Sequence, residues 1–311
     1  MNNNQVAKKK KPLITVVILS WNRKEEVIQT LTNLSMSRFR NFEVILVDNS
    51  SSDGTVEAVS KAFPEVRTIR LPDNRGIYGY NVGFANARGK YVVVLDDDSH
   101  PARESLGKIA RAFREDRDKK IGIIAMEIVN SSTGRIVTES WPEGDWITFW
   151  GCGAAIRKEL LDDLGGYDED FFIYANEYDL AIRAMDAGWR VVYRPDIVAY
   201  HRECKKHRSW KRTGLTGARN EAWFHIKHFP WYIIPVLSVI TCSRYLIKGI
   251  TKRSASYAAY SLGGYLRGLA TFWKPLARRK VVSKSVAWKF LRHHWLTAPV
   301  WRYIPVSLKE S

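Results

Sequence analysis

The chain is poor in cysteine and in long apolar runs. Its 311 residues include three cysteines, Cys152, Cys204 and Cys242, which are widely spaced and form no CxxC pair. A disulfide framework is therefore not indicated, and a reducing compartment fits. An uncharged stretch at 229–243 is fifteen residues long, whereas a membrane-spanning helix needs about 20 apolar residues. The segment 1–12 lacks the apolar core of a signal peptide, and we expect it to be a disordered tail.

Acidic residues are scarce in the last third of the chain. From His201 onward there are 22 Lys and Arg against three acidic residues, a net charge of about +19, whereas the whole chain carries +17. The first two thirds are therefore slightly acidic. Such charge asymmetry predicts a polyanionic partner for the last third, either an anionic membrane surface or a nucleic acid.

The same third is rich in tryptophan. It contains Trp210, Trp223, Trp231, Trp273, Trp288, Trp295 and Trp301. Aromatic and cationic residues that flank short apolar segments are typical of helices lying in a membrane interface. We therefore predict that residues 205–311 form a basic helical region that associates with an anionic membrane surface. A basic helical domain with an ordinary core is the alternative.

Alternating segments predict an α/β fold for the rest of the chain. Apolar, β-branched runs indicate strands at 14–20, 42–47, 67–71 and 91–95. Helices are expected between them, near 24–36, 55–63 and 80–88. Such alternation implies βαβ units and a parallel sheet. Further strands are expected at 121–129 and 191–200, with a loop at 139–146.

Three adjacent carboxylates follow the apolar run 91–95, which has the composition of a strand covered on both faces. They belong to Asp96, Asp97 and Asp98. Their mutual repulsion favours a divalent cation, at the strand-end edge where open α/β sheets bind ligands. Carboxylates suit Mg²⁺ or Mn²⁺, whose open positions would bind diphosphate oxygens. A solvated acidic turn, with Ser99 capping the next helix, is the alternative.

A second acidic segment contains a candidate general base. A helix is expected to begin near Tyr174 or Asn176, which places Glu177 in its first turn, where the helix dipole favours an anion. Asp179 and Arg183 are four residues apart and can pair on one helix face. Asp179 therefore has a stronger structural explanation than Glu177. A carboxylate at the ligand edge of the sheet suits a base that deprotonates a sugar hydroxyl.

The order of these motifs resembles the inverting nucleotide-sugar glycosyltransferases of family 2, which have the GT-A fold. The matching pieces are 17–23, 47–55, 74–76 with 81–83, 96–98, and 165–169 leading to Glu177. Several spaced motifs in one order are more specific than any one alone. The resemblance implies a GT-A, Rossmann-like nucleotide-binding sheet at 13–204. The tail resembles the membrane-associated extension of bacterial enzymes that build rhamnan, O-antigen and other surface glycans.

The resemblance also implies roles for individual residues. Nucleotide-sugar binding is implied for Ser20, Asn22, Asp48, Asn74, Arg75, Asn81, Asp96, Asp97, Trp150 and Gly153. Metal binding, with Mg²⁺ or Mn²⁺ as the cofactor, is implied for Asp98, Asp96 and His201. The family usually has Glu-Asp where this chain has Asn176 and Glu177, so Glu177 takes the position of the usual catalytic Asp with a side chain one methylene longer.

We therefore expect a metal-dependent inverting glycosyltransferase, a hexosyl- or deoxyhexosyltransferase, that moves a sugar from a nucleotide-diphosphate donor to a hydroxyl of a glycan acceptor, here a lipid-linked one. It would serve cell-surface polysaccharide synthesis at the cytoplasmic face of the cell membrane, and a homo-oligomer is compatible with the sequence. Removing the residues after about 205 should leave a soluble catalytic domain.

Two other functions compete with this one. A sugar-phosphate nucleotidyltransferase is the enzyme alternative, although the first strand lacks the Gly-rich, basic phosphate loop of such enzymes. A nucleic-acid-binding protein is the non-enzyme alternative, suggested by the charge. The chain contains no recognisable reading motif, and we expect no nucleic-acid partner.

Overall fold

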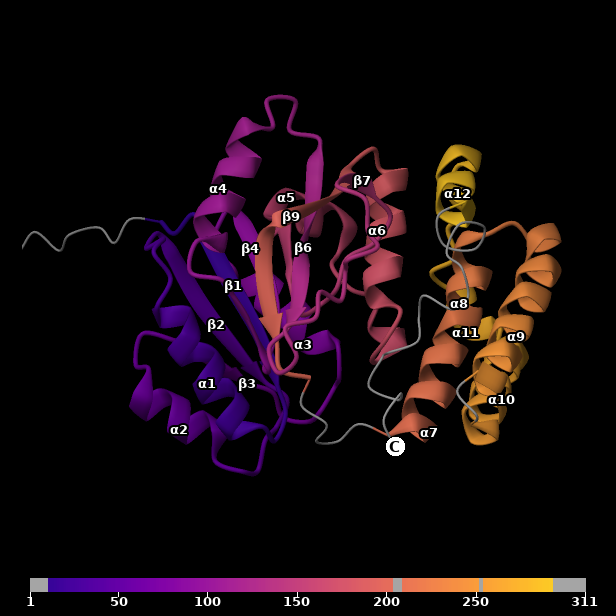
Figure 1. Cartoon of the computed structure of the whole chain (residues 1–311), viewed down its shortest axis with the longest axis horizontal. Coiled ribbons are helices and arrows are strands. Elements are labelled where there is room, and N and C mark those ends of the chain that lie inside the picture. Colours follow the sequence, from indigo (N-terminus) through magenta and orange to yellow (C-terminus); the bar gives the residue numbers. More distant parts are fainter. Residues whose placement is uncertain (1–10, 204–208, 252–253, 293–311) are drawn as a thin grey trace, which may run out of the picture.

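The computed structural model describes residues 11–203, 209–251 and 254–292. Within these residues nine strands form one sheet with helices on both faces, and the helices of the last third pack beside this α/β unit (Figure 1). The fold is therefore an α/β sheet with C-terminal helices, as the sequence predicted. The expected tail at 1–12 falls almost entirely outside the described residues.

The first half of the sheet is parallel, as the alternating pattern predicted. Its strands lie in the order β3 (Arg67–Arg70), β2 (Phe42–Asp48), β1 (Ile14–Ser20) and β4 (Tyr91–Asp96). The connecting helices are α1 (Lys24–Ser35), α2 (Thr55–Ala62) and α3 (Tyr78–Asn86). Asp53 helps α1 and α2 to begin, because its carboxylate accepts hydrogen bonds from the backbone N–H groups of Lys24 and Thr55.

The second half of the sheet is mixed, so the parallel arrangement does not extend across all of it. Here β8 (Ala154–Arg157) runs antiparallel between β4 and β6 (Ile121–Asn130), and β9 (Arg190–His201) is parallel to β6. Two short strands pair antiparallel with β9, namely β5 (Ser99–Pro101) and β7 (Gly144–Trp146).

Two local expectations are corrected by these short strands. The segment 139–146, expected to be a loop, ends in β7, because pairing with β9 satisfies its backbone groups. Ser99 begins β5, where the alternative interpretation made it a helix cap. The acidic triplet is thus followed by a strand of the same sheet and not by a solvated helix start.

Alternate residues of β4 face two separate cores. Val92 and Val94 belong to one apolar cluster, and Val93 and Leu95 belong to the other. Helices α3, α5 (Lys158–Leu164) and α6 (Asn176–Asp186) contribute to the first cluster, and α1, α2 and α4 (Ser105–Glu115) contribute to the second. Both faces of β4 are buried, as its continuous apolar run predicted.

The helices of the last third share a core with the α/β unit. They are α7 (Trp210–Arg212), α8 (Ala218–His228), α9 (Ile234–Thr251), α10 (Ala255–Ala270), α11 (Trp273–Leu276) and α12 (Lys284–Leu291), with a π-helical turn at Thr213–Gly217 and 3₁₀ turns at Glu169–Phe171 and Trp231–Ile233. The cluster that holds Val94 also holds Phe224, Leu237 and Phe290. The helical prediction is confirmed for the described part of 205–311, but these helices are packed into the molecule.

The tryptophans of this region divide into two groups. Trp231, Trp273 and Trp288 are 51%, 58% and 61% exposed. Trp223 is buried, and its indole N–H donates to the Thr271 hydroxyl at 3.0 Å, so its expected place in a membrane interface is wrong. Trp295 and Trp301, together with the Trp210 side chain, lie outside the described part of the structure.

A buried group of charges joins α8 to the α/β unit. Lys227 Nζ lies 2.6 Å from Asp168 Oδ2 and 2.5 Å from Asp179 Oδ1, and His228 Nε2 lies 2.8 Å from the same Asp179 oxygen. Arg183 pairs with Asp179 at 2.7 Å, as the sequence predicted. Burial opposes ionisation of Asp179, but Arg183, His228 and Lys227 hold its pKa well below the usual range.

This junction predicts the effect of losing the helical region. Truncation after residue 205 removes Lys227 and His228 and uncovers the apolar cluster around Val94. We therefore expect truncation to destabilise the α/β unit, in place of the soluble catalytic domain that the sequence led us to expect.

A single substitution tests the junction. Lys227→Met keeps most of the side-chain volume but leaves two buried carboxylates without their shared cation, so the free energy of unfolding should fall by about 3 kcal/mol. Urea denaturation of the full chain measures it. Lys61→Met, at an exposed site on α2, is the control and should change stability by less than about 0.5 kcal/mol. If Lys227→Met is as stable as Lys61→Met, the Lys227 contacts do not stabilise the packing of α8 on the α/β unit.

Candidate active site at the carboxyl edge of the sheet

Four strands end at polar residues on the same edge of the sheet. β1 ends at Ser20, β2 at Asp48, β4 at Asp96 and β9 at His201. The pairing directions make all four strands run the same way, because the two antiparallel steps across β8 cancel. The carboxyl ends of such strands are where open α/β sheets bind ligands. The structure therefore brings together residues from four of the sequence motifs.

The acidic triplet is balanced in part by a cation of the protein itself. Arg23, just before α1, lies 2.9 Å from Asp97 Oδ1 and 3.3 Å from Asp98 Oδ2. Burial raises the pKa of Asp97 to about 7, although Arg23 opposes the shift. Tyr80 of α3 donates to Asp96 Oδ1 at 3.0 Å. Arg23 thus balances part of the negative charge of the triplet without a divalent cation.

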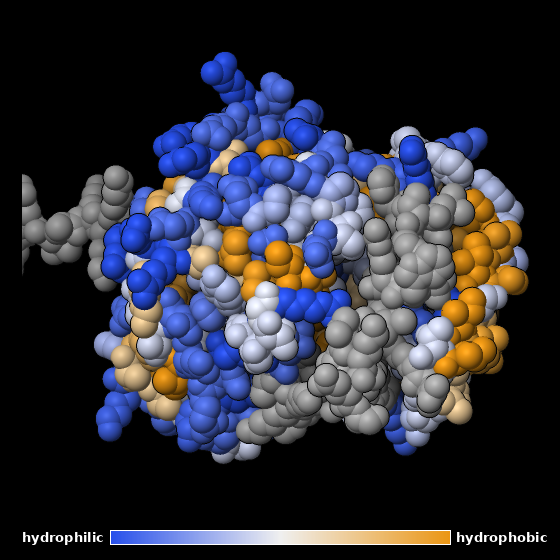
Figure 2. All heavy atoms as spheres, viewed as in Figure 1, coloured by the Kyte–Doolittle hydropathy of each residue, from blue (hydrophilic) through white to orange (hydrophobic). Residues whose placement is uncertain are grey.

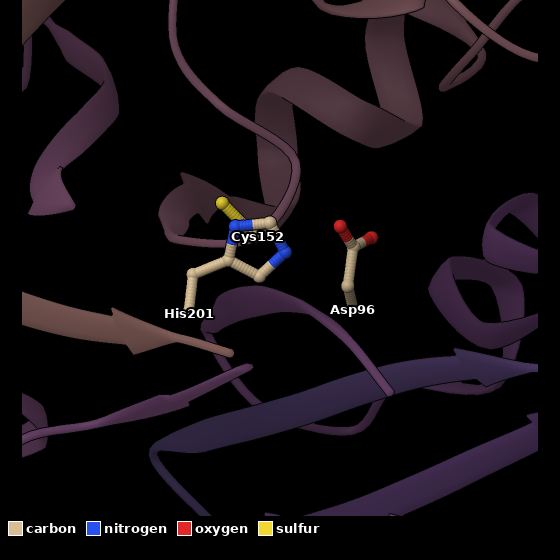
Figure 3. A group of neighbouring side chains, drawn as sticks. All are labelled: Asp96, Cys152 and His201. Carbon is tan, nitrogen blue, oxygen red and sulfur yellow. The ribbon is translucent and has the colours of Figure 1, made fainter. Parts of the chain in front are cut away.

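Asp96 belongs to a cluster of three different metal-ligand types. Its carboxylate, the Cys152 thiol and the His201 imidazole place their ligand atoms within 4.8 Å of one another. Figure 3 shows the imidazole between the sulfur and the carboxylate. Asp98, which we expected to be a ligand, lies 3.1 Å from His201 Nε2. Burial opposes protonation of His201, but Cys152 and Asp98 raise its pKa to about 11.

These donors fit a divalent cation. Carboxylate oxygen and imidazole nitrogen both suit Mn²⁺, and carboxylate oxygen suits Mg²⁺. Asp96 and His201, both predicted metal ligands, belong to this cluster, and Asp98 contacts the imidazole. Cys152 also belongs to this cluster, although the spacing of the cysteines in the sequence did not predict it as a metal ligand.

Glu177 lies in the first turn of α6, as predicted. Its side chain is partly exposed, and a Cβ built on Gly151 would come within 2.8 Å of Glu177 Oε1. Any side chain at position 151 would therefore displace the carboxylate. Burial, together with the charge of Asp96, raises the pKa of Glu177 to about 7, which is the range in which a carboxylate can take up and release protons near neutral pH.

The backbone before Glu177 is held in an unusual conformation. Left-handed φ values of 61°, 69° and 65° occur at Phe172, Tyr174 and Ala175, and each costs roughly 1 kcal/mol or more in a non-glycine residue. Asn220 of α8, fully buried, points its Nδ2 at three carbonyl oxygens of this loop, at 2.9 Å for Phe171, 2.6 Å for Ile173 and 3.0 Å for Tyr174. The C-terminal helices thus hold the loop that leads into Glu177.

A second part of the edge has buried oxygens that can accept hydrogen bonds. Asp48 Oδ2 accepts from the Ser51 N–H at 2.9 Å. Among the described residues, however, Asp48 Oδ1, Ser20 Oγ and Asn49 Oδ1 have no hydrogen-bond partner. Buried polar atoms are otherwise paired almost without exception. A ligand whose N–H and O–H groups reached this part of the edge would satisfy these acceptors.

The other residues predicted to bind the donor fall into two groups that differ in their contacts. Asn22 Oδ1 and Asn74 Oδ1 accept from the N–H groups of Ser52 and Gly76 and shape the loops beside Asp48. Arg75 is exposed, pairs with Glu169 at 3.2 Å and lies over the Tyr78 ring.

Of three further predicted residues, two have contacts within the protein that explain them without a ligand. The Asn81 side-chain amide donates to the Tyr167 carbonyl and accepts from the Tyr167 N–H, at 2.8 Å each. We therefore remove Asn81 from the set of donor-binding residues. Gly153 is buried and packs against Ile128 and Ala199, which makes it a packing residue. Trp150 is 44% exposed in the loop that carries Gly151 and Cys152, and it keeps its expected place beside the site.

Comparison with known proteins identifies the family. The family model described as glycosyl transferase family 2 matches residues 15–165, and that described as glycosyl transferase family group 2 matches residues 91–309. The chain belongs to glycosyltransferase family 2. The resemblance suggested by the motif order is therefore confirmed.

Relatives of this family 2 chain include bacterial enzymes. It is 23% identical to the N-acetylglucosaminyl-diphospho-decaprenol L-rhamnosyltransferase of Mycobacterium tuberculosis, in an alignment covering 72% of this chain and 88% of the relative. It is 26% identical to the uncharacterized glycosyltransferase YfnE of Bacillus subtilis, covering 61% and 64%. The chain thus spans just under two thirds of the Bacillus protein.

Solved structures show the same fold. Staphylococcus aureus TarS 1-349 in complex with UDP-GlcNAc has a TM-score of 0.61 and 17% identity, covering 93% of this chain and 89% of that one. The Pyrobaculum calidifontis mannosyltransferase in complex with GDP-Man and Mn²⁺ has a TM-score of 0.56 and 21% identity, covering 94% and 83%. The GT-A fold implied by the motifs is confirmed for the α/β part.

Asn220 yields a prediction for the loop before Glu177. Asn220→Asp keeps the side-chain shape but removes the N–H donors, so the carbonyl oxygens of Phe171, Ile173 and Tyr174 each lose a hydrogen bond and the free energy of unfolding should fall by about 2 kcal/mol. Amide exchange in residues 171–177 should accelerate, measured by hydrogen–deuterium exchange. Asn33→Asp, on the surface of α1, is the control and should leave this exchange unchanged. If Asn220→Asp also leaves it unchanged, α8 does not hold the loop.

Proposed function

We propose that the protein is an inverting glycosyltransferase that moves a sugar from a nucleotide-diphosphate donor to a hydroxyl of a lipid-linked glycan in cell-surface polysaccharide synthesis. The position of Glu177 is the main support for this proposal. Its carboxylate, with a pKa of about 7, lies beside the Gly151–Cys152 loop, at the edge of the sheet that also holds the Asp96 and His201 side chains. The rhamnosyltransferase relative supports a lipid-linked acceptor and a deoxyhexose or hexose donor.

The donor nucleotide binds at the ends of β1 and β2. Ser20 Oγ and Asp48 Oδ1 accept hydrogen bonds from the base or ribose of the nucleotide, and the diphosphate extends toward Asp96. Asp96 and His201 would hold a divalent cation, Mg²⁺ or Mn²⁺, which would neutralise charge on the leaving diphosphate. Asp98 and Tyr80 fix the orientation of these two side chains through the contacts described above.

Glu177 acts on the acceptor. Its ionised carboxylate removes the proton of the acceptor hydroxyl, and the oxygen attacks the anomeric carbon on the face opposite the leaving group, so the configuration inverts in one step. Gly151 leaves space for the carboxylate, and the Asn220-bound loop sets where α6 begins. A covalent enzyme intermediate is not needed, because the acceptor itself is the nucleophile.

The C-terminal helices supply a surface for the membrane. Between Trp231 and Thr251 the exposed side chains are all uncharged, and Val239 and Ile250 are 67% and 76% exposed. Figure 2 shows apolar residues gathered at the edge formed by α9 and α10. This stretch is long and apolar enough to cross a bilayer by length and composition, with 28% of its most apolar window buried.

We assign this surface to the cytoplasmic leaflet as a peripheral contact. Exposed Arg267, Lys274 and Lys280 lie in the same helical region, and anionic lipids attract such cations with about 1 kcal/mol each. The exposed apolar face then enters the interface while the opposite face of α9 stays packed on α8 and α10. This contact would hold the protein at the leaflet that carries a lipid-linked acceptor.

The base assignment predicts the behaviour of Glu177→Gln. The amide keeps the shape but cannot accept the proton, so turnover should fall by a factor on the order of 10² or more, while affinity for nucleoside diphosphate stays as in the wild type. Release of nucleoside diphosphate with a membrane extract as acceptor source measures turnover. Glu159→Gln, exposed on α5, should retain full activity. Near-normal turnover of Glu177→Gln overturns the assignment.

The raised pKa predicts a pH profile. A base works only when ionised, and with a pKa of about 7 Glu177 is about one-tenth ionised at pH 6 and about nine-tenths ionised at pH 8. Turnover at saturating donor should therefore rise with pH and reach half its plateau near pH 7. Stopped assays across this range, with unfolding monitored in parallel, measure it. A profile that is flat between pH 6 and 8 contradicts the role of Glu177.

The membrane surface predicts vesicle binding. The full chain should sediment with anionic vesicles and less with neutral ones, and high salt should remove only part of the binding. Val239→Glu should weaken it about tenfold, since burying one such side chain is worth ~1.5 kcal/mol. Ser60→Glu, exposed on α2, is the charge-matched control. Failure to sediment under every condition, or displacement by RNA alone, contradicts a membrane contact.

A further inference from the structure

Cys152 is the least expected member of the cluster at the sheet edge. Its side chain is buried, and its sulfur lies with the Asp96 carboxylate and the His201 imidazole within 4.8 Å (Figure 3). The residue is a free thiol, as is Cys242. The loop that carries it also carries Gly151, which borders Glu177. One short loop thus contacts both the candidate metal ligands and the candidate base.

We infer that Cys152 is a sulfur ligand of the metal site and makes the site favour Mn²⁺, and softer ions such as Co²⁺, over Mg²⁺. Thiolate sulfur binds soft and borderline cations well and binds Mg²⁺ poorly, whereas carboxylate oxygen binds Mg²⁺ and Mn²⁺ alike. An Asp96–His201 pair alone would discriminate weakly. The sulfur adds a donor that only the softer ions use.

The binding step has a simple proton balance. The S–H bond of Cys152 and one N–H bond of the protonated His201 imidazole break, a metal–sulfur and a metal–nitrogen bond form, and both protons are released to solvent. No oxidation or reduction takes place.

The inference rests on the proposed function only in assuming that this edge binds a divalent cation. The test uses the full chain with metal alone, in the absence of any nucleotide sugar. The chain has three cysteines, so Cys204→Ser with Cys242→Ser leaves Cys152 as the single thiol. The matched control adds Cys152→Ser to the same background.

Two measurements are made on this pair. Co²⁺ titration is followed by the near-ultraviolet charge-transfer band of a cobalt–thiolate bond, which reports sulfur ligation directly and needs no activity. Mn²⁺ affinity is measured by electron paramagnetic resonance, with Mg²⁺ as competitor. We expect one equivalent of the band with Cys152 present and none without it. Cys152→Ser should weaken Mn²⁺ binding by about tenfold or more and change Mg²⁺ binding by less than about threefold.

The outcomes separate this inference from the proposed function. Co²⁺ and Mn²⁺ binding without the band, or with equal Mn²⁺ affinity in both proteins, overturns sulfur ligation and leaves the metal-dependent transferase intact. Absence of divalent-cation binding in both proteins overturns the inference and also the metal part of the proposed function. Because the cobalt band is read on the protein with Cys152 in place, the result does not depend on how well the serine variant folds.

Discussion

The convergence of four strand ends on one edge of the sheet is the constraint on which the rest of the structure depends. Ser20, Asp48, Asp96 and His201 each close a strand, and they meet only because β9 runs in the same direction as β4. Two antiparallel steps, through β8, produce that direction. The mixed half of the sheet is therefore what brings His201, far along the chain, beside Asp96. A sheet with one antiparallel step fewer would place the imidazole at the opposite edge.

The C-terminal helices take part in this site as well as in the fold. Lys227 and His228 of α8 contact the buried Asp179 carboxylate of α6, and Asn220 holds the loop before Glu177. The same helices present the exposed apolar face of α9.

The parts of the site that could be predicted from sequence are those that local patterns specify. Apolar runs located the central strands to within a residue or two, and the polar residue that follows each run was assigned to the ligand edge. Glu177 was predicted to be the base because its place in the helix gave it no ion-pair partner, whereas Arg183 is four residues from Asp179. Arg23, Cys152 and Asn220 were missed, because their contacts join segments far apart in the chain and no spacing pattern encodes such pairs. Asn81 was misassigned because a motif records residue types and not which atoms are already bonded.

The central claim, that the edge formed by β1, β2 and β4 binds a nucleotide-diphosphate sugar, is tested most directly by thermal unfolding of the full chain with a panel of nucleotide sugars in the presence of Mn²⁺. Asp48→Asn serves as the comparison, since it keeps the hydrogen bond to the Ser51 N–H but alters the acceptor at Oδ1. The account predicts that at least one nucleotide sugar raises the melting temperature of the wild type and raises that of the variant less. Protection of both proteins to the same extent, or of neither by any member of the panel, would contradict it.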